Sequence, residues 1–97
     1  MVTKIAIYGT RYAGNGAQVT HYHHFLIQRD GLVITCKRVI DSDDCIYVAF
    51  ITGDGTLSDP QCQGLVSLGL ACCVTYKLLP KDIKCEGTTW EELLRRG

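Results

Sequence analysis

The sequence predicts an α/β fold in which a mixed β-sheet of about four to five strands is covered by a long helix and a short C-terminal helix. Three observations predict it: a continuous apolar run at residues 45–52, two strand-like runs around an Arg-Asp-Gly turn, and a capped helical pattern that begins at Ser58. The chain has 97 residues, of which 46% are hydrophobic. Because this length suits one core and the sequence shows no repeat or linker, residues 1–97 are expected to form a single domain.

The first half of the chain is predicted to consist of strands. Residues 3–8 alternate weakly between apolar and polar side chains, which indicates a first strand. A loop with the turn sequence Gly14-Asn15-Gly16 follows. The runs 22–28 and 32–39 flank Arg29-Asp30-Gly31, and together they predict a β-hairpin.

The second half is predicted to contain a central strand and two helices. Residues 45–52 are apolar without alternation, which is typical of a strand buried on both faces. Ser58 and Gln61 form a capping box with Pro60 in the first turn, so a helix is expected to begin there. Its apolar stripe contains Leu65, Leu68, Cys72 and Tyr76. Either Thr88 or Thr89 is expected to cap a last helix, whose predicted buried side is Trp90, Leu93 and Leu94.

Composition excludes several classes of protein. Ten Lys and Arg balance ten Asp and Glu, so no net positive charge drives general nucleic-acid binding. No apolar run approaches the roughly 18 residues that cross a bilayer, and no membrane association is expected. The N-terminus lacks the pattern of a secretion signal. The six cysteines include the adjacent pair Cys72-Cys73 and no CxxC spacing, so we expect reduced thiols in a cytoplasmic protein.

One segment carries a family resemblance. His24-Phe25-Leu26-Ile27-Gln28-Arg29-Asp30-Gly31 resembles the hairpin motif of the zinc N-acetylmuramoyl-L-alanine amidases, a family that includes phage amidase-type lysozymes and peptidoglycan-recognition proteins. Three further segments are similar in the same order: residues 4–10, the helix start at 58–61, and residues 84–90. The resemblance spans nearly the whole chain and implies a degenerate and shortened amidase-like domain.

The departures from the family concern its zinc site. The family holds zinc with a histidine that ends the first strand, a second histidine before the last helix, and a cysteine or aspartate shortly after. Here the first position is Tyr8, residues 79–83 contain no histidine, and Cys85 alone remains. The place of the family's catalytic tyrosine is taken by His23. Because catalytic zinc needs three protein ligands and an open position, the resemblance implies that hydrolysis is lost.

All three histidines lie within the segment 21–24. Alternation along a strand places His21 and His23 on one face, so one hypothesis is a replacement zinc site made of His21, His23 and Cys85. The other is that His21 and His23 project into an open cleft without metal, while His24 is the core residue that the resemblance implies. We expect no cofactor, with zinc as the alternative.

The remaining candidates suit an anionic ligand. Arg11 and Tyr12 follow the first strand, and Arg38 stands near a strand end. Arginine binds phosphate or carboxylate with a planar fork, and an aromatic ring stacks on a base. The predicted ligand-binding residues are Tyr8, Arg11, Tyr12, His21, His23 and Arg38.

Function is expected to follow from this site. The first hypothesis is a non-catalytic binding protein, of phage type, that captures a small anionic ligand such as a nucleotide-derived immune signal and so acts as an anti-defence sponge in the host cell cytoplasm. The alternative is a minimal zinc-dependent amidase that cleaves peptidoglycan. The second alternative is an inhibitor that acts by binding another protein. Association into a homo-oligomer stays open.

Overall fold

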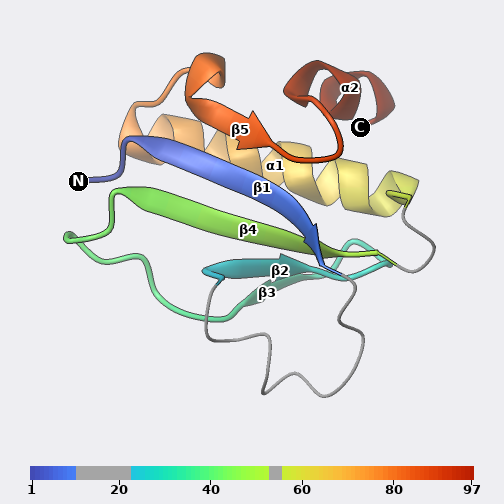
Figure 1. Cartoon of the computed structure of the whole chain (residues 1–97), viewed down its shortest axis with the longest axis horizontal. Helices are drawn as coiled ribbons and strands as arrows, with labels where there is room; N and C mark the ends of the chain where they lie inside the picture. Colours follow the sequence, from blue (N-terminus) through green and yellow to red (C-terminus); the bar gives the residue numbers. More distant parts are fainter. Residues whose placement is uncertain (11–22, 53–55) are drawn as a thin grey trace.

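The structure is a computed structural model that describes residues 1–10, 23–52 and 56–97. Its strands are β1 (Lys4–Thr10), β2 (Phe25–Ile27), β3 (Val33–Thr35), β4 (Cys45–Ile51) and β5 (Ile83–Cys85). They form one sheet in the order β3-β2-β4-β1-β5 (Figure 1). β2, β4, β1 and β5 run parallel, and β3 pairs antiparallel with β2 in the predicted hairpin. The predicted mixed sheet is confirmed.

The apolar run that predicted a central strand forms β4, which lies in the middle of the sheet between β2 and β1. Ile46 and Val48 point to one face and Ala49 to the other, and all three are at most 2% exposed. Tyr47 is the exception, because its side chain is 41% exposed. A strand that is paired on both edges and buries most of its side chains needs apolar residues at nearly every position, which is why this run could be recognised.

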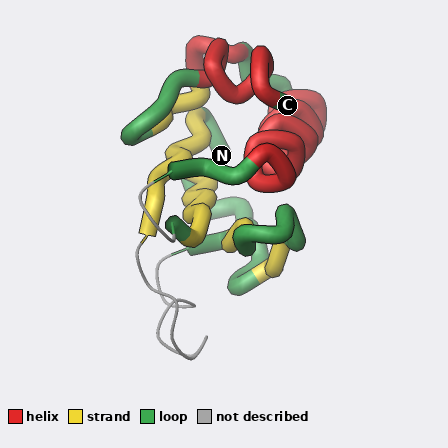
Figure 2. Tube along the Cα trace, turned by 90° about the vertical axis from the view of Figure 1, so that its right-hand side faces the viewer, coloured by secondary structure: helices red, strands yellow, loops and turns green. Residues whose placement is uncertain are grey.

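Both helices pack on the same face of the sheet (Figure 2). They are α1 (Asp59–Tyr76) and α2 (Trp90–Arg96). The core between the layers joins strand residues to helix residues: Ile5, Ile7, Ile46, Val48, Phe50, Cys62, Leu65, Cys72, Trp90 and Leu93. The predicted buried side of α2 is wrong at one position, because Leu94 is 46% exposed while Leu93 is fully buried. None of the described helices is both long and apolar enough to cross a bilayer.

The helix starts follow the predicted caps. Ser58 caps α1, where its hydroxyl accepts from the Gln61 N–H at 3.1 Å and the Gln61 side chain accepts from the Ser58 N–H at 3.0 Å. Thr89, rather than Thr88, caps α2 by accepting from the Glu92 N–H. A single 3₁₀ turn, η2 (Pro80–Asp82), connects α1 to β5.

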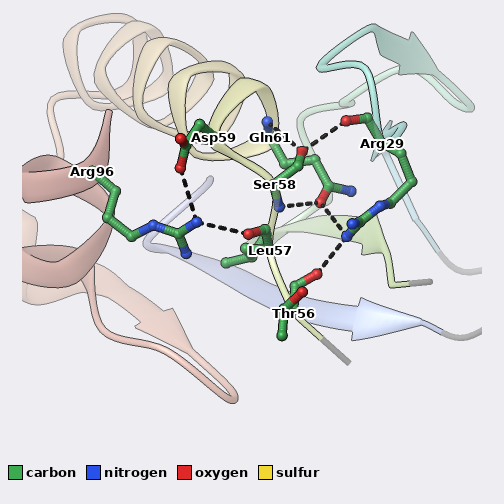
Figure 3. A network of polar contacts seen from close by, with 7 residues as sticks. All are labelled: Arg29, Thr56, Leu57, Ser58, Asp59, Gln61 and Arg96. Atoms are coloured by element: carbon green, nitrogen blue, oxygen red, sulfur yellow. Dashed lines mark hydrogen bonds and ion pairs between the residues drawn. The ribbon is translucent and has the colours of Figure 1, made fainter. Parts of the chain in front are cut away.

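Arg29 and Gln61 connect the hairpin turn to the start of α1 (Figure 3). The Arg29 guanidinium donates to the Thr56 carbonyl and to Gln61 Oε1. Gln61 Nε2 donates to the carbonyls of Ile51 at 2.6 Å and Ile27 at 3.4 Å. The arginine of the resemblance motif therefore has a structural role, since it joins the hairpin turn to residues 56–61 at the start of α1.

The glycine of the same motif is required by both backbone conformation and space. Gly31 has φ +89°, and a Cβ there would lie 2.7 Å from the Pro60 carbonyl oxygen. Gly87 has φ +79° with nothing within 4 Å of its Cβ position. We expect Gly31→Ala to lower the free energy of unfolding by about 2 to 4 kcal/mol, from the left-handed backbone and the contact together.

Gly87→Ala is the matched control, with an expected loss of about 1 to 2 kcal/mol from the backbone alone. Urea unfolding of both variants measures the difference. Equal losses would show that the contact with Pro60 relaxes without cost.

Candidate functional site

The face of the sheet opposite to the helices carries a row of side chains from four strands. The register aligns Tyr8 of β1 with Ala49 of β4, Ala49 with Leu26 of β2, and Leu26 with Ile34 of β3. These four residues, with Cys36 and Ile51, form a second and smaller apolar cluster. No described helix covers this side of the sheet, and we call it the open face.

Tyr8 and His23 contact each other on the open face. The Tyr8 hydroxyl is hydrogen-bonded to His23 Nδ1, and the two ring centroids lie 5.3 Å apart at an angle of 54°. His23 precedes β2 and is 6% exposed. His23 is therefore enclosed and does not project into an open cleft as expected, whereas His21, the other histidine of that expectation, lies outside the described residues.

The surroundings of this pair favour the uncharged form of both side chains. Burial, with smaller contributions from Tyr47 and Cys45, raises the pKa of Tyr8 to about 12. Burial lowers the pKa of His23, and the positive charge of Lys37 acts in the same direction. At neutral pH the pair is a neutral phenol bound to a neutral imidazole.

His24 is fully buried, as expected for a core residue, and holds two segments together. Its Nδ1 accepts from the Tyr47 N–H at 3.0 Å, so the neutral ring carries its proton on Nε2, which donates to Asp43 Oδ2 at 3.1 Å. Asp43 Oδ2 also accepts from the Ile40 N–H at 2.9 Å. His24 therefore fixes the chain beside His23 to both β4 and the loop before it.

The Asp43 carboxylate makes stability depend on pH. The hydrogen bond from the Ile40 N–H, followed by that from His24, lowers the pKa of Asp43. A lowered pKa in the folded state means that the stabilisation is present above the unfolded value of about 3.9 and is lost as pH falls through the folded value.

We expect Asp43→Asn to remove the pH-dependent stabilisation that the Asp43 carboxylate provides. As the pH falls from about 5 to about 2, the variant should therefore lose less free energy of unfolding than the wild type. Urea unfolding across that range measures both slopes. Parallel pH profiles would contradict the role of Asp43.

Two solved structures have a fold similar to that of this chain. The endolysin N-acetylmuramoyl-L-alanine amidase LysCS from Clostridium intestinale URNW superimposes with a TM-score of 0.73 at 12% identity, over 97% of this chain and 82% of the other. The N-acetylmuramoyl-L-alanine amidase LysC from Clostridium intestinale URNW gives a TM-score of 0.70 at 13% identity, over 97% and 84%. No protein-family model matches the sequence, and no curated protein matches it. The chain has the amidase fold.

Within the amidase fold, the residues that the resemblance assigns to zinc do not fit a metal. Tyr8 occupies the first ligand position. Cys85 pairs with Ile7 across β1 and β5 and packs against the core on the helix side, whereas Tyr8 lies in the cluster on the open face. The sheet thus separates Cys85 from His23. Among residues 1–10, 23–52 and 56–97, no three His, Cys, Asp or Glu side chains come together as a metal site.

The other predicted ligand-binding residues are only partly placed. Arg11, Tyr12 and His21 lie outside the described residues. Arg38 is exposed in the irregular segment after β3 and makes no hydrogen bond or ion pair with another described residue through its side chain. Lys37 was not among the predicted set. Its main-chain N–H donates to the His24 carbonyl at 3.4 Å, which places it beside the histidine segment.

A pocket of about 560 Å³ lies away from the Tyr8–His23 pair, beside α2 and the carboxyl ends of β1 and β4. Phe50 and Leu57 contribute apolar walls, and Glu86 and Glu92 contribute carboxylates. Its one arginine, Arg96, is engaged with Asp59 at 3.0 Å and with the Leu57 carbonyl at 2.7 Å. This pocket is therefore less suited to an anion than the surroundings of His23, where the exposed Lys37 makes no ion pair with described residues.

Proposed function

We propose that this chain is a non-catalytic binding protein with the amidase fold, which captures a small anionic ligand on its open face. One observation carries the proposal. At the two positions where the resemblance places a zinc-binding histidine and a catalytic tyrosine, this chain has Tyr8 and His23, and the two side chains bind each other. A phenol and an imidazole joined in this way offer polar groups to a ligand, and the described residues place no metal site beside them to activate water.

The positive charge of Lys37, which acts on the His23 ring, supports an anionic ligand. Lys37 and Arg38 follow β3, are exposed, and form no ion pair within the described part of the chain. A guanidinium binds phosphate or carboxylate with two parallel hydrogen bonds, and an ammonium adds a point charge. The proposed site also includes Arg11, Tyr12 and His21, which the sequence places in the segment between β1 and β2.

The ligand class that we propose is a nucleotide-derived immune signal, bound by a phage-type protein in the host cell cytoplasm. Aromatic faces suit the stacking of a base, and the cationic side chains suit its phosphates. Capture without chemistry would lower the free concentration of the signal, which is the action of a sponge.

Ligand-induced thermal stabilisation tests this proposal. At a concentration 100 times the Kd, a ligand that binds only the folded state stabilises it by about 2.7 kcal/mol, which raises the Tm of a domain of this size by roughly 10 to 20 °C. We expect such a shift with a member of a panel of linear and cyclic nucleotides, and its loss in His23→Ala.

Lys81→Ala is the matched control, because Lys81 is an exposed cation in η2. It should leave the shift unchanged. If no nucleotide in the panel shifts the Tm of the wild type, the proposed ligand class is wrong.

The competing function is zinc-dependent cleavage of peptidoglycan, favoured by the names of the two structural neighbours, both amidases. Metal analysis of the purified protein separates the two. About one zinc per chain, lost together with muropeptide cleavage in His23→Ala, would replace the binding proposal with the amidase.

A role in binding another protein is the second competing function, and the outer surface of α1 favours it. Residues 60–76 contain no Lys, Arg, Asp or Glu, and Leu70 and Val74 are 49% and 81% exposed. Uncharged surface of this kind is common where proteins dock. If no nucleotide or muropeptide stabilises the protein and Val74→Lys abolishes its association with a partner, this function replaces ligand capture.

A further inference from the structure

The hydrogen bond between Tyr8 and His23 has a direction that the surrounding contacts determine. Within the described residues, the Tyr8 hydroxyl has no partner other than His23 Nδ1. If Nδ1–H donated to Tyr8, the described residues would offer no acceptor to the phenolic proton and no donor to the lone pair on Nε2. If Tyr8 donates, the phenol is satisfied and the imidazole proton stands on Nε2. The second arrangement pairs more groups, and a phenol with a pKa of about 12 keeps the proton that it donates.

The Nε2 atom is then a donor without a described partner. His23 is nearly buried, with 6% of its surface exposed. A nearly buried ring N–H to which no described residue offers an acceptor is the arrangement expected of a ligand-binding donor.

From these contacts we infer that Tyr8 is a positioning residue that holds His23 as the Nε2–H tautomer, and that Nε2–H donates to an oxygen atom of an oxyanion. This inference rests on the proposed function and assigns the atom that performs it. Tyr8 itself need not touch the ligand.

The neighbouring charges specify the class of ligand. Lys37 lies close enough to His23 for its charge to act on the ring, and its side chain is exposed without an ion pair among described residues. An N–H donor beside an ammonium selects an acceptor that carries negative charge, and it disfavours amines and other cations. Phosphate and carboxylate oxygens share this chemistry.

The tautomer is measured directly by long-range proton–nitrogen NMR correlations of the His23 ring. We expect a protonated Nε2 and an unprotonated, hydrogen-bonded Nδ1 in the wild type. In Tyr8→Phe the Nδ1 signal should move to the position of an acceptor without a hydrogen bond, while the backbone amide spectrum stays folded. A proton on Nδ1 of the wild type would overturn the inference without any ligand present.

Titration with inorganic phosphate, at constant ionic strength set with sodium chloride, tests the donor. The Nε2–H signal should shift, and Lys37→Ala should weaken the response by about tenfold, as expected for a hydrogen bond to a charged group. His23→Gln places an amide N–H close to the position of Nε2 and should retain part of the affinity, whereas His23→Leu should lose it. Lys81→Ala should change nothing.

Acetate in a parallel titration separates the two sources of the oxyanion. If phosphate shifts the Nε2–H signal at a lower concentration than acetate does, the oxyanion is a phosphate. If acetate does so at the lower concentration, it is a carboxylate. Either result supports the inference. If a nucleotide stabilises the protein while the His23 signals stay unchanged, the inference is wrong and the proposed function stands. If neither phosphate, acetate nor any nucleotide binds, both fail.

Discussion

Gln61→Ala is expected to lower the free energy of unfolding by about 3 to 5 kcal/mol, the largest effect of any single substitution considered. The Gln61 side chain is fully buried, and its amide makes four hydrogen bonds. Truncation leaves the carbonyls of Ile27 and Ile51 and the Ser58 N–H without this partner. Each unsatisfied buried group costs about 1 to 3 kcal/mol, and the vacated volume adds to that.

Gln63→Ala is the matched control, because Gln63 lies on the same helix and is exposed. It should change stability by less than about 0.5 kcal/mol. Urea unfolding of the two variants gives the comparison. A loss below about 1 kcal/mol in Gln61→Ala would mean that water replaces the amide without cost, and that the link between the hairpin and α1 is not what holds this end of the fold.

His24→Ala is expected to cost about 2 to 4 kcal/mol. The substitution removes a fully buried ring that stacks on Tyr47 with centroids 6.0 Å apart. It also leaves the Tyr47 N–H without its acceptor and removes one of the two hydrogen bonds to Asp43 Oδ2. Lost packing and one unsatisfied buried donor account for the estimate.

His24→Asn separates these contributions, because the asparagine carbonyl lies near the position of Nδ1 and still accepts from Tyr47. It should recover part of the stability that His24→Ala loses, without restoring the contact to Asp43. Thermal and urea unfolding measure the difference. Equal losses in the two variants would show that the hydrogen bond to Tyr47 contributes nothing.

The parts of the fold that the sequence predicts are those determined by local chemistry. The apolar run of β4 and the box of Ser58 and Gln61 each need only their own few residues to be recognised. β5 has three residues, too few to show a periodicity, and its place at the sheet edge depends on pairing with β1. The exposure of Leu94 depends on the short length of α2 and on the way α2 packs against α1. The spacing of apolar residues along the helix does not predict either of these.

Less of the candidate site than of the fold can be predicted from the sequence. The resemblance pointed to Tyr8 and His23 separately, but their contact joins positions 15 residues apart and depends on the path of the chain between them. The separation of Cys85 from His23 follows from the register of β5, which fixes the face on which each side chain lies. Lys37 carries no sequence signal beyond its charge, and its relevance appears only once β3 brings it beside His24.

Native mass spectrometry of the protein purified from the cells that make it tests most directly whether the chain captures a small anion without a metal. We predict a complex whose added mass is that of a small organic anion, reduced in His23→Leu and retained in Lys81→Ala. A chain that carries one zinc ion and no organic ligand would contradict it.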